Sequence, residues 1–153
     1  MKVFLSTDHG GFEMKEAIKA HLSARGIAVE DCGACAIDPQ DDYPDFVIPM
    51  AEKVATGWAA GEEVLGAVLG RSGNGEAIAA NKVRGIRCAL CMNDEMARKG
   101  REHNNANVIA LGGDYIDIAT AKRLVDLFVA TPFSGDGRHQ RRIDKMMDYE
   151  KRH

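Results

Sequence analysis

The segment from Val64 to Lys82 reads VLGAVLGRSGNGEAIAANK, and it decides the fold. Residues 64–69 form a short apolar run, which predicts a buried strand. Residues 70–76 follow, with three glycines around Ser72 and Asn74, and they lead directly into the alanine-rich residues 77–82. A buried strand that passes through a glycine-rich turn into a helix is typical of parallel α/β proteins.

The same alternation of short apolar runs and helical periodicity continues on both sides of this segment. Further strands are predicted at residues 3–5, 27–29, 86–91 and 108–111. Apolar residues that recur every three or four positions predict helices, in the sets Met14, Ile18, Leu22; Phe46, Met50, Val54; and Ala121, Leu124, Val125, Phe128. Strands that alternate with helices pair in parallel through right-handed crossovers. We therefore expect a Rossmann-like α/β fold, a three-layer α-β-α sandwich with five parallel strands and a C-terminal helix from about Arg138.

Length and composition exclude several classes of protein. The chain has 153 residues, 45% of them hydrophobic and 28% charged, which predicts a single domain over residues 1–153. No apolar run reaches the length of a membrane span and no basic-then-apolar leader opens the chain, so we expect a cytoplasmic protein with no membrane partner. A formal charge of −3 gives no reason to expect nucleic acid as a partner.

Four cysteines form two CxxC pairs, Cys32 with Cys35 and Cys88 with Cys91. Such pairs are candidates for a zinc site. The two pairs lie 52 residues apart, however, and in a strand over 86–91 the odd spacing sends Cys88 and Cys91 to opposite faces. We therefore expect no metal and interpret the cysteines as apolar packing residues. A metal-binding or redox-active protein is the minor alternative.

Polar and glycine-rich residues follow three of the predicted strands. They are Asp8-His9-Gly10-Gly11, the loop Gly70–Glu76, and Gly112-Gly113-Asp114. In parallel sheets ligands bind beyond the carboxyl ends of the strands, so these residues predict a site at one edge. The loop 70–76 would expose backbone N–H groups at a helix N-terminus, which suits a phosphate or an enolate oxygen. It has neither the P-loop nor the GxGxxG spacing.

Individual residues allow both a structural and a catalytic interpretation. Glu76, in the first turn of its helix, either complements the helix dipole or acts as a general base beside the oxyanion loop. Asp8 is either a helix cap or a ligand for a sugar hydroxyl, and His9 a satisfied polar group or a phosphate ligand. His103 lies in the polar run 101–107, whose hydrogen-bonding groups are typical of sugar sites.

Three arginines, Arg138, Arg141 and Arg142, fall on neighbouring faces of one predicted helical turn. A solvated charged face is the structural interpretation of this cluster. A clamp that binds phosphate through paired N–H groups is the functional one.

Five motifs in order along the chain resemble those of the ribose-5-phosphate isomerase B family, which also contains galactose-6-phosphate and allose-6-phosphate isomerases. The motifs span essentially the whole chain and are specific in combination. They are Asp8-His9-Gly10-Gly11, Asp42-Tyr43-Pro44-Asp45, the segment Gly70–Lys82, Arg101–Asn104 and Gly137–Arg142.

The resemblance implies an aldose–ketose isomerase that works through a cis-enediolate without metal, nucleotide or other cofactor. In many members a cysteine opens the glycine loop as the base, and the equivalent position here is Gly70. The chain instead resembles the branch in which a glutamate takes that role, here Glu76. His103 would open the furanose ring with help from Asp8, and Ser72 with the N–H groups of Gly73, Asn74 and Gly75 would stabilise the enediolate.

The remaining site residues are implied by the same resemblance. His9, Arg138 and Arg142 would bind the phosphate, and Tyr43 and Asn104 would contact the substrate. In this family His103, Asn104 and the C-terminal arginines reach into a neighbouring subunit's site. We therefore expect at least a homodimer with shared active sites, and pairing of dimers into a tetramer is left open.

One departure from the family pattern concerns the phosphate. Where the family commonly has Gly-x-Arg after the fifth strand, this chain has Gly112-Gly113-Asp114, and Arg71 stands where a glycine is usual. We expect Arg71 and Asp114 to lie close and partly neutralise each other, or Arg71 to take over phosphate binding.

The leading interpretation is interconversion of ribose 5-phosphate and ribulose 5-phosphate, a reaction of the pentose phosphate pathway. Allose 6-phosphate, galactose 6-phosphate or an unphosphorylated sugar is the alternative substrate. A non-catalytic domain that binds sugar phosphates is the alternative from another class.

Overall fold

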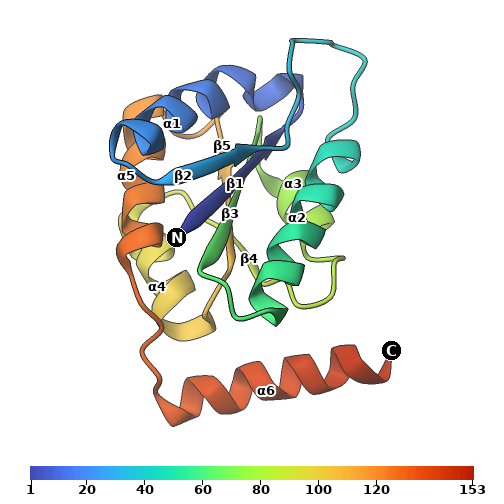
Figure 1. Ribbon diagram of the computed structural model, residues 1–153, viewed down its shortest axis with the longest axis vertical. Helices are drawn as coiled ribbons and strands as arrows, with labels where there is room; N and C mark the ends of the chain where they lie inside the picture. Colours follow the sequence, from blue (N-terminus) through green and yellow to red (C-terminus); the bar gives the residue numbers. More distant parts are fainter.

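The computed structural model describes residues 1–153 and alternates strands with helices, as the sequence predicts (Figure 1). The strands are β1 Lys2–Thr7, β2 Ala28–Asp31, β3 Val64–Gly70, β4 Cys88–Leu90 and β5 Val108–Gly112. The helices are α1 Phe12–Ala24, α2 Pro44–Ala59, α3 Asn74–Ala80, α4 Asp94–Asn104, α5 Ile118–Ala130 and α6 Gly137–Arg152, with a 3-10 turn at His9–Gly11 before α1.

All five strands pair in parallel, in the order β2-β1-β3-β5-β4. From β1 the chain first crosses to β2 on one side and then to β3 on the other. The β1/β3 boundary is therefore a topological switch point, where α/β proteins bind their ligands beyond the strand ends. The predicted α/β fold with five parallel strands is confirmed, and the turn after β1 and the loop after β3 meet at this switch point.

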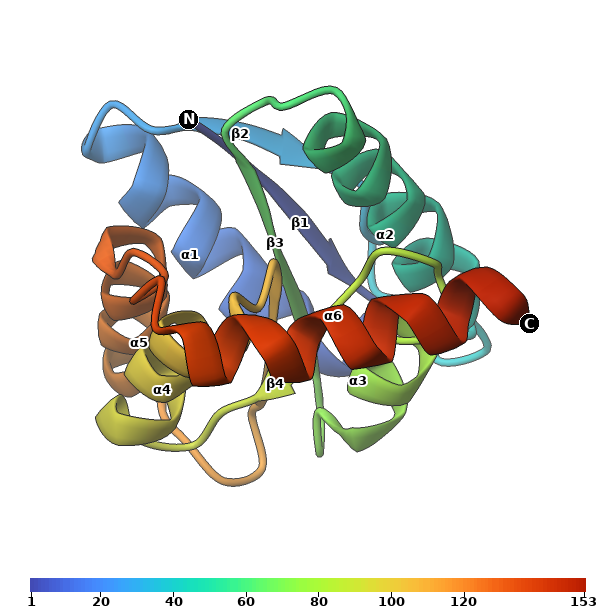
Figure 2. The same ribbon diagram turned by 90° about the horizontal axis from the view of Figure 1, so that it is seen from below.

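Two apolar cores lie on the two faces of the sheet. Helices α1, α4 and α5 cover one face, and α2 and α3 cover the other (Figures 1 and 2). Successive side chains of β1 divide between them, because Leu5 packs in the first core and Phe4 in the second. The predicted helical positions Ile18 and Leu22 are fully buried on α1.

The expected strand over 86–91 is shorter than predicted, at three residues. Cys88 nevertheless packs against the α2/α3 core and Cys91 lies in the α1/α4/α5 core, so their opposite orientation is confirmed. Burial raises the pKa of the Cys91 thiol to about 12 and also raises that of Cys88. Both thiols are therefore protonated at neutral pH and pack as small apolar groups.

A buried lysine fixes the path of the chain after β2. Lys15 is 1% exposed, and its Nζ donates to Asp31 Oδ2 at 2.7 Å and to the Ala34 carbonyl at 2.8 Å. The Ala34 N–H in turn donates to the Thr7 carbonyl at 2.9 Å. These bonds tie the start of the β2–α2 loop to the carboxyl end of β1.

Helix α6 differs from the others because it lies across the amino-terminal edge of the sheet (Figures 1 and 2). It buries only His139 and Ile143, and it leaves Met146 and Tyr149 exposed. Neither α6 nor any other helix has the length and hydrophobicity needed to cross a lipid bilayer.

The two-core arrangement predicts very different costs for the same substitution on two helices. Ile18 of α1 is 0% exposed and Ile78 of α3 is 61% exposed. Ile18→Ala leaves a cavity and should lower the free energy of unfolding by about 2–5 kcal/mol. Ile78→Ala is the matched control and should change it by about 0.5 kcal/mol or less. Urea unfolding at one fixed protein concentration measures both, and equal costs would contradict this assignment of the core.

Candidate active site

Hydrogen bonds join the ends of three strands at the carboxyl edge of the sheet. The Gly113 N–H donates to the Gly70 carbonyl at 2.9 Å, and the Asp114 N–H donates to the Arg71 carbonyl at 2.8 Å. From β1, the hydroxyl of Thr7 donates to the Leu69 carbonyl at 2.7 Å. The carboxyl ends of β1, β3 and β5, where the sequence places three polar segments, are therefore held as one unit.

The loop after β3 turns at Gly73, which caps α3 with φ of +75°, a left-handed conformation that favours glycine. The Ser72 hydroxyl accepts from the Asn74 N–H at 3.2 Å. The first turn of a helix leaves backbone N–H groups without intrahelical acceptors, and here this turn begins at Asn74. This geometry suits the binding of an oxyanion.

Glu76 lies in the first turn of α3 and is only 5% exposed. Its carboxylate lies directly against the Cα of Gly70, in the space that any side chain at position 70 would occupy. Burial raises the pKa of Glu76, and the negative charge of Asp8 raises it further, against a lowering by its own backbone N–H. A raised pKa makes this carboxylate a stronger base than an exposed glutamate.

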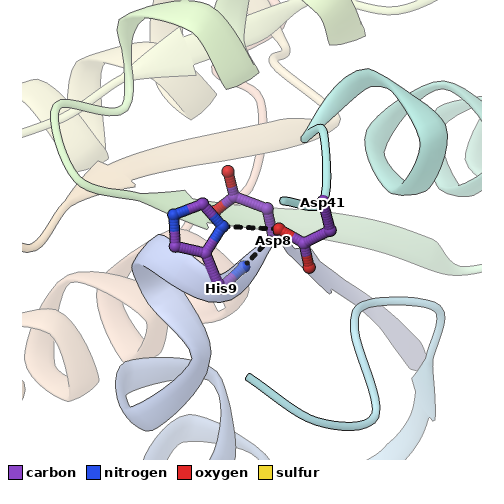
Figure 3. A group of neighbouring side chains, drawn as sticks. All are labelled: Asp8, His9 and Asp41. Carbon is purple, nitrogen blue, oxygen red and sulfur yellow. Dashed lines mark hydrogen bonds and ion pairs between the residues drawn. The ribbon is translucent and has the colours of Figure 1, made fainter. Parts of the chain in front are cut away.

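Asp8, His9 and Asp41 cluster beside this loop (Figure 3). Asp8 is 8% exposed and its Oδ1 accepts from the Gly10 N–H at 2.8 Å, as a cap does. His9 Nδ1 lies 2.5 Å from Asp41 Oδ1. The three side chains offer metal-ligand atoms within 4.8 Å of one another, and Oδ1 of each carboxylate also accepts a backbone hydrogen bond.

Tyr43, Arg71 and Asp114 complete the groups at this edge. The Tyr43 ring lies against the Cα of Gly75. Arg71 Nε lies 3.4 Å from Asp114 Oδ1, which confirms the expectation that these two residues are neighbours. Because the side chains are 74% and 46% exposed, the pair contributes little to stability. Both line a pocket of about 560 Å³ next to His9.

The other predicted residues lie at the opposite edge of the sheet. Helix α4 starts after the carboxyl end of β4 and returns to the amino end of β5, so its last residues, His103 and Asn104, lie at that edge. The exposed Arg138 and Arg142 lie on α6, which crosses the same edge (Figure 1). The four residue steps of β5 alone separate the two edges by about 13 Å. One chain therefore does not bring these four residues to Glu76.

His139, which lies within the motif Gly137–Arg142, is buried against His103. The two rings stack with centroids 4.2 Å apart and planes 11° from parallel. Burial lowers the pKa of His139, and the adjacent His103 lowers it further, which disfavours a charged His139 in this stack. The stack holds the His103 ring in place at the end of α4.

The chain matches the model of the ribose/galactose isomerase family over residues 3–146. It is 52% identical over 153 residues to ribose-5-phosphate isomerase B of Mycolicibacterium paratuberculosis, covering all of this chain and 94% of the relative. The Mycobacterium tuberculosis enzyme of the same name is 50% identical, with 100% and 92% covered.

Solved structures agree with these matches. Ribose-5-phosphate isomerase B from Mycoplasma genitalium with bound ribulose-5-phosphate superposes with a TM-score of 0.92 at 39% identity, over 98% of this chain and 96% of that one. The Clostridium thermocellum protein of the same name gives 0.91 at 41% identity, over 99% of both chains.

The raised pKa of Glu76 predicts how stability depends on pH. An acid whose pKa is higher in the folded than in the unfolded protein weakens the fold as pH rises from its unfolded pKa through its folded pKa. Glu76→Gln removes this penalty. The variant should therefore gain stability relative to the wild type as pH rises above about 4.5 and keep a constant advantage once Glu76 is fully ionised. Urea unfolding from pH 5 to pH 8 measures the difference; a variant less stable at pH 8 would contradict the burial argument.

Proposed function

We propose that this chain, which belongs to the ribose/galactose isomerase family, interconverts ribose 5-phosphate and ribulose 5-phosphate as a single-domain protein. The chain is an isomerase, since its relatives over the full length are named for that activity. The structure with bound ribulose-5-phosphate belongs to a relative at 39% identity and supports the choice of a pentose phosphate.

Glu76 is the base in this proposal. The main support for this role is the burial of its carboxylate against Gly70. Aldose–ketose isomerisation moves a proton between C2 and C1 of the open-chain sugar. A buried carboxylate with a raised pKa can take the proton from one carbon and return it to the next. The step needs no metal or nucleotide.

The negative charge that develops on the sugar oxygens needs donors that are already in place. The Ser72 hydroxyl and the backbone N–H groups of residues 73–75 lie in the turn beside Glu76 and would supply them. Among these groups the Asn74 N–H already donates to Ser72 Oγ, so it would have to exchange this acceptor for a sugar oxygen. Asp8 and Tyr43 flank the same turn and would bind sugar hydroxyls.

Ring opening and phosphate binding use residues from a second copy of the chain. We assign His103 as the group that protonates the ring oxygen, with Asn104 beside it, and Arg138 and Arg142 as phosphate ligands. All four lie at the edge opposite Glu76, so they serve the site only across a subunit interface. A homodimer with two shared sites satisfies this requirement.

A second candidate substrate follows from Asp114. A carboxylate where the family pattern has an arginine repels a dianion, and its pairing with exposed Arg71 offsets this only in part. This observation favours an unphosphorylated sugar, or an aldose phosphate such as allose 6-phosphate or galactose 6-phosphate, whose chain is one carbon longer and can place the phosphate away from Asp114. The isomerase mechanism is the same for each.

Replacing the proposed base tests the chemistry. Glu76→Gln keeps the volume of the side chain but cannot accept a proton, so kcat should fall at least about 100-fold while substrate still binds. Ketose formation measured in steady state gives kcat, and calorimetry gives binding. The exposed Glu63→Gln is the matched control and should leave kcat unchanged. Near-normal turnover by Glu76→Gln would remove Glu76 as the base.

Mixing two inactive variants tests the shared site. Glu76→Gln and His103→Ala should each be inactive as homodimers. A heterodimer has one site with both substitutions and one with neither, so co-expression at equal levels should restore about a quarter of wild-type activity. Differently tagged chains allow the heterodimer to be purified and assayed. A heterodimer as inactive as its parents would show that both residues act within one chain.

A further inference from the structure

Asp41 takes no part in the proposed isomerisation, yet its carboxylate lies only 2.5 Å from the ring of His9, which the family resemblance implies as a phosphate ligand. It lies at the end of the β2–α2 loop, whose start is bonded to Lys15 of α1 and, through the Ala34 N–H, to Thr7 of β1. Its side chain is 11% exposed, far less than is usual for a loop aspartate. The sequence signal was weak, because Asp41 only precedes the motif that begins at Asp42.

One oxygen of Asp41 binds His9 twice. Asp41 Oδ1 accepts the backbone N–H of His9 at 3.1 Å and lies 2.5 Å from Nδ1 of the ring. These contacts fix both the main chain and the ring plane of His9. The second ring nitrogen, Nε2, lies on the far side of the ring from Asp41 (Figure 3). His9 lines the pocket of about 560 Å³ beside Arg71 and Gly113, so Nε2 is the ring atom left to meet a ligand there.

The other oxygen, Asp41 Oδ2, is buried and has no hydrogen-bond partner. A buried carboxylate oxygen without a partner is costly unless a positive charge lies nearby. A protonated imidazole on Nδ1 provides that charge. The arrangement of Asp41 therefore favours the His9 cation over the neutral ring.

We propose that Asp41 is a positioning residue, which holds His9 as an imidazolium with its Nε2–H directed into the pocket for an anionic group of the substrate. A ring that donates Nδ1–H to a carboxylate keeps Nε2–H as a charge-assisted donor. Arg71 is already paired with Asp114 in this pocket. His9 supplies a second cationic donor, and the buried Asp41 fixes the position of its ring. The link to substrate rests on the proposed function; the link between Asp41 and His9 does not.

The charges around His9 determine the pH dependence. The hydrogen bond that the His9 ring donates to Asp41 is the largest cause that raises the pKa of His9, opposed by desolvation and aided by the charges of Asp8, Asp41 itself and Asp38. The other charged residues that line the same pocket are Glu13, Arg71, Asp114 and Asp117. Below its raised pKa His9 carries the charge that binds an anion, so KM for a phosphorylated sugar should rise as pH increases through that pKa.

Asp41→Asn tests the proposal, with Asp38→Asn as the matched control. Asp38 lies in the same loop and carries the same charge, but its side chain bonds Gln40 and not His9. The titration midpoint of the His9 ring, followed by NMR, should fall clearly in Asp41→Asn and stay close to wild type in Asp38→Asn. At pH 7.5, KM for ribose 5-phosphate should rise about tenfold in Asp41→Asn, with kcat within about twofold of wild type.

Asp41→Glu is the conservative control, because it distinguishes the loss of the carboxylate from a general disruption of the loop. It keeps the carboxylate, so its His9 midpoint should lie above that of Asp41→Asn, and thermal unfolding should show all three variants folded. An equal His9 midpoint in Asp41→Asn and Asp38→Asn would overturn the proposal, as would a fall in kcat with KM unchanged.

The NMR titration needs no substrate, so it separates this proposal from the proposed function. If the wild type fails to isomerise ribose 5-phosphate, the His9 midpoints still decide the role of Asp41. Inorganic phosphate then serves as the anion probe. It should shift the His9 resonance in the wild type at lower concentration than in Asp41→Asn, and equal phosphate affinity would contradict the proposal.

Discussion

The contact between the Glu76 carboxylate and the bare Cα of Gly70 is the constraint on which the site depends. It requires β3 to end on a residue without a side chain and α3 to begin within one short turn, at the switch point of the sheet. The buried carboxylate lowers stability at neutral pH, and the same burial raises its pKa toward the range where a base is useful. The burial that makes Glu76 a stronger base therefore also makes the fold less stable at neutral pH.

Much of the fold could be predicted because hydrophobic periodicity reflects which face of an element is buried. The run 64–69 is buried throughout and Met14, Ile18 and Leu22 lie on the buried face of α1, so both predictions were confirmed. Helix α4 was not predicted, since only Ala97 and Gly100 of its residues are buried and its sequence shows no apolar stripe. The strand over 86–91 was predicted too long, because β4 lies at the sheet edge and pairs only with β5.

The sequence predicts those site residues that directly follow a strand. It does not predict contacts between residues that are far apart in the sequence. Polar residues after β1, β3 and β5 mark one edge in any parallel sheet, and the Arg71–Asp114 pair was expected from complementary departures in two of these loops. The contact between His9 and Asp41 joins residues 32 positions apart through an irregular loop, which no periodicity describes. The stack of His103 on His139 likewise depends on how α6 packs against α4.

Proton exchange at C2 of the substrate tests the central claim most directly. Wild-type enzyme stripped of metal would be mixed in D2O with ribose 5-phosphate, allose 6-phosphate, galactose 6-phosphate, free ribose and free allose, and followed by NMR. We predict deuterium exchange at C2 and conversion to the ketose with ribose 5-phosphate. Exchange with another sugar alone would reassign the substrate and implicate Asp114, whereas no exchange with any of them would contradict the enediolate mechanism assigned to Glu76.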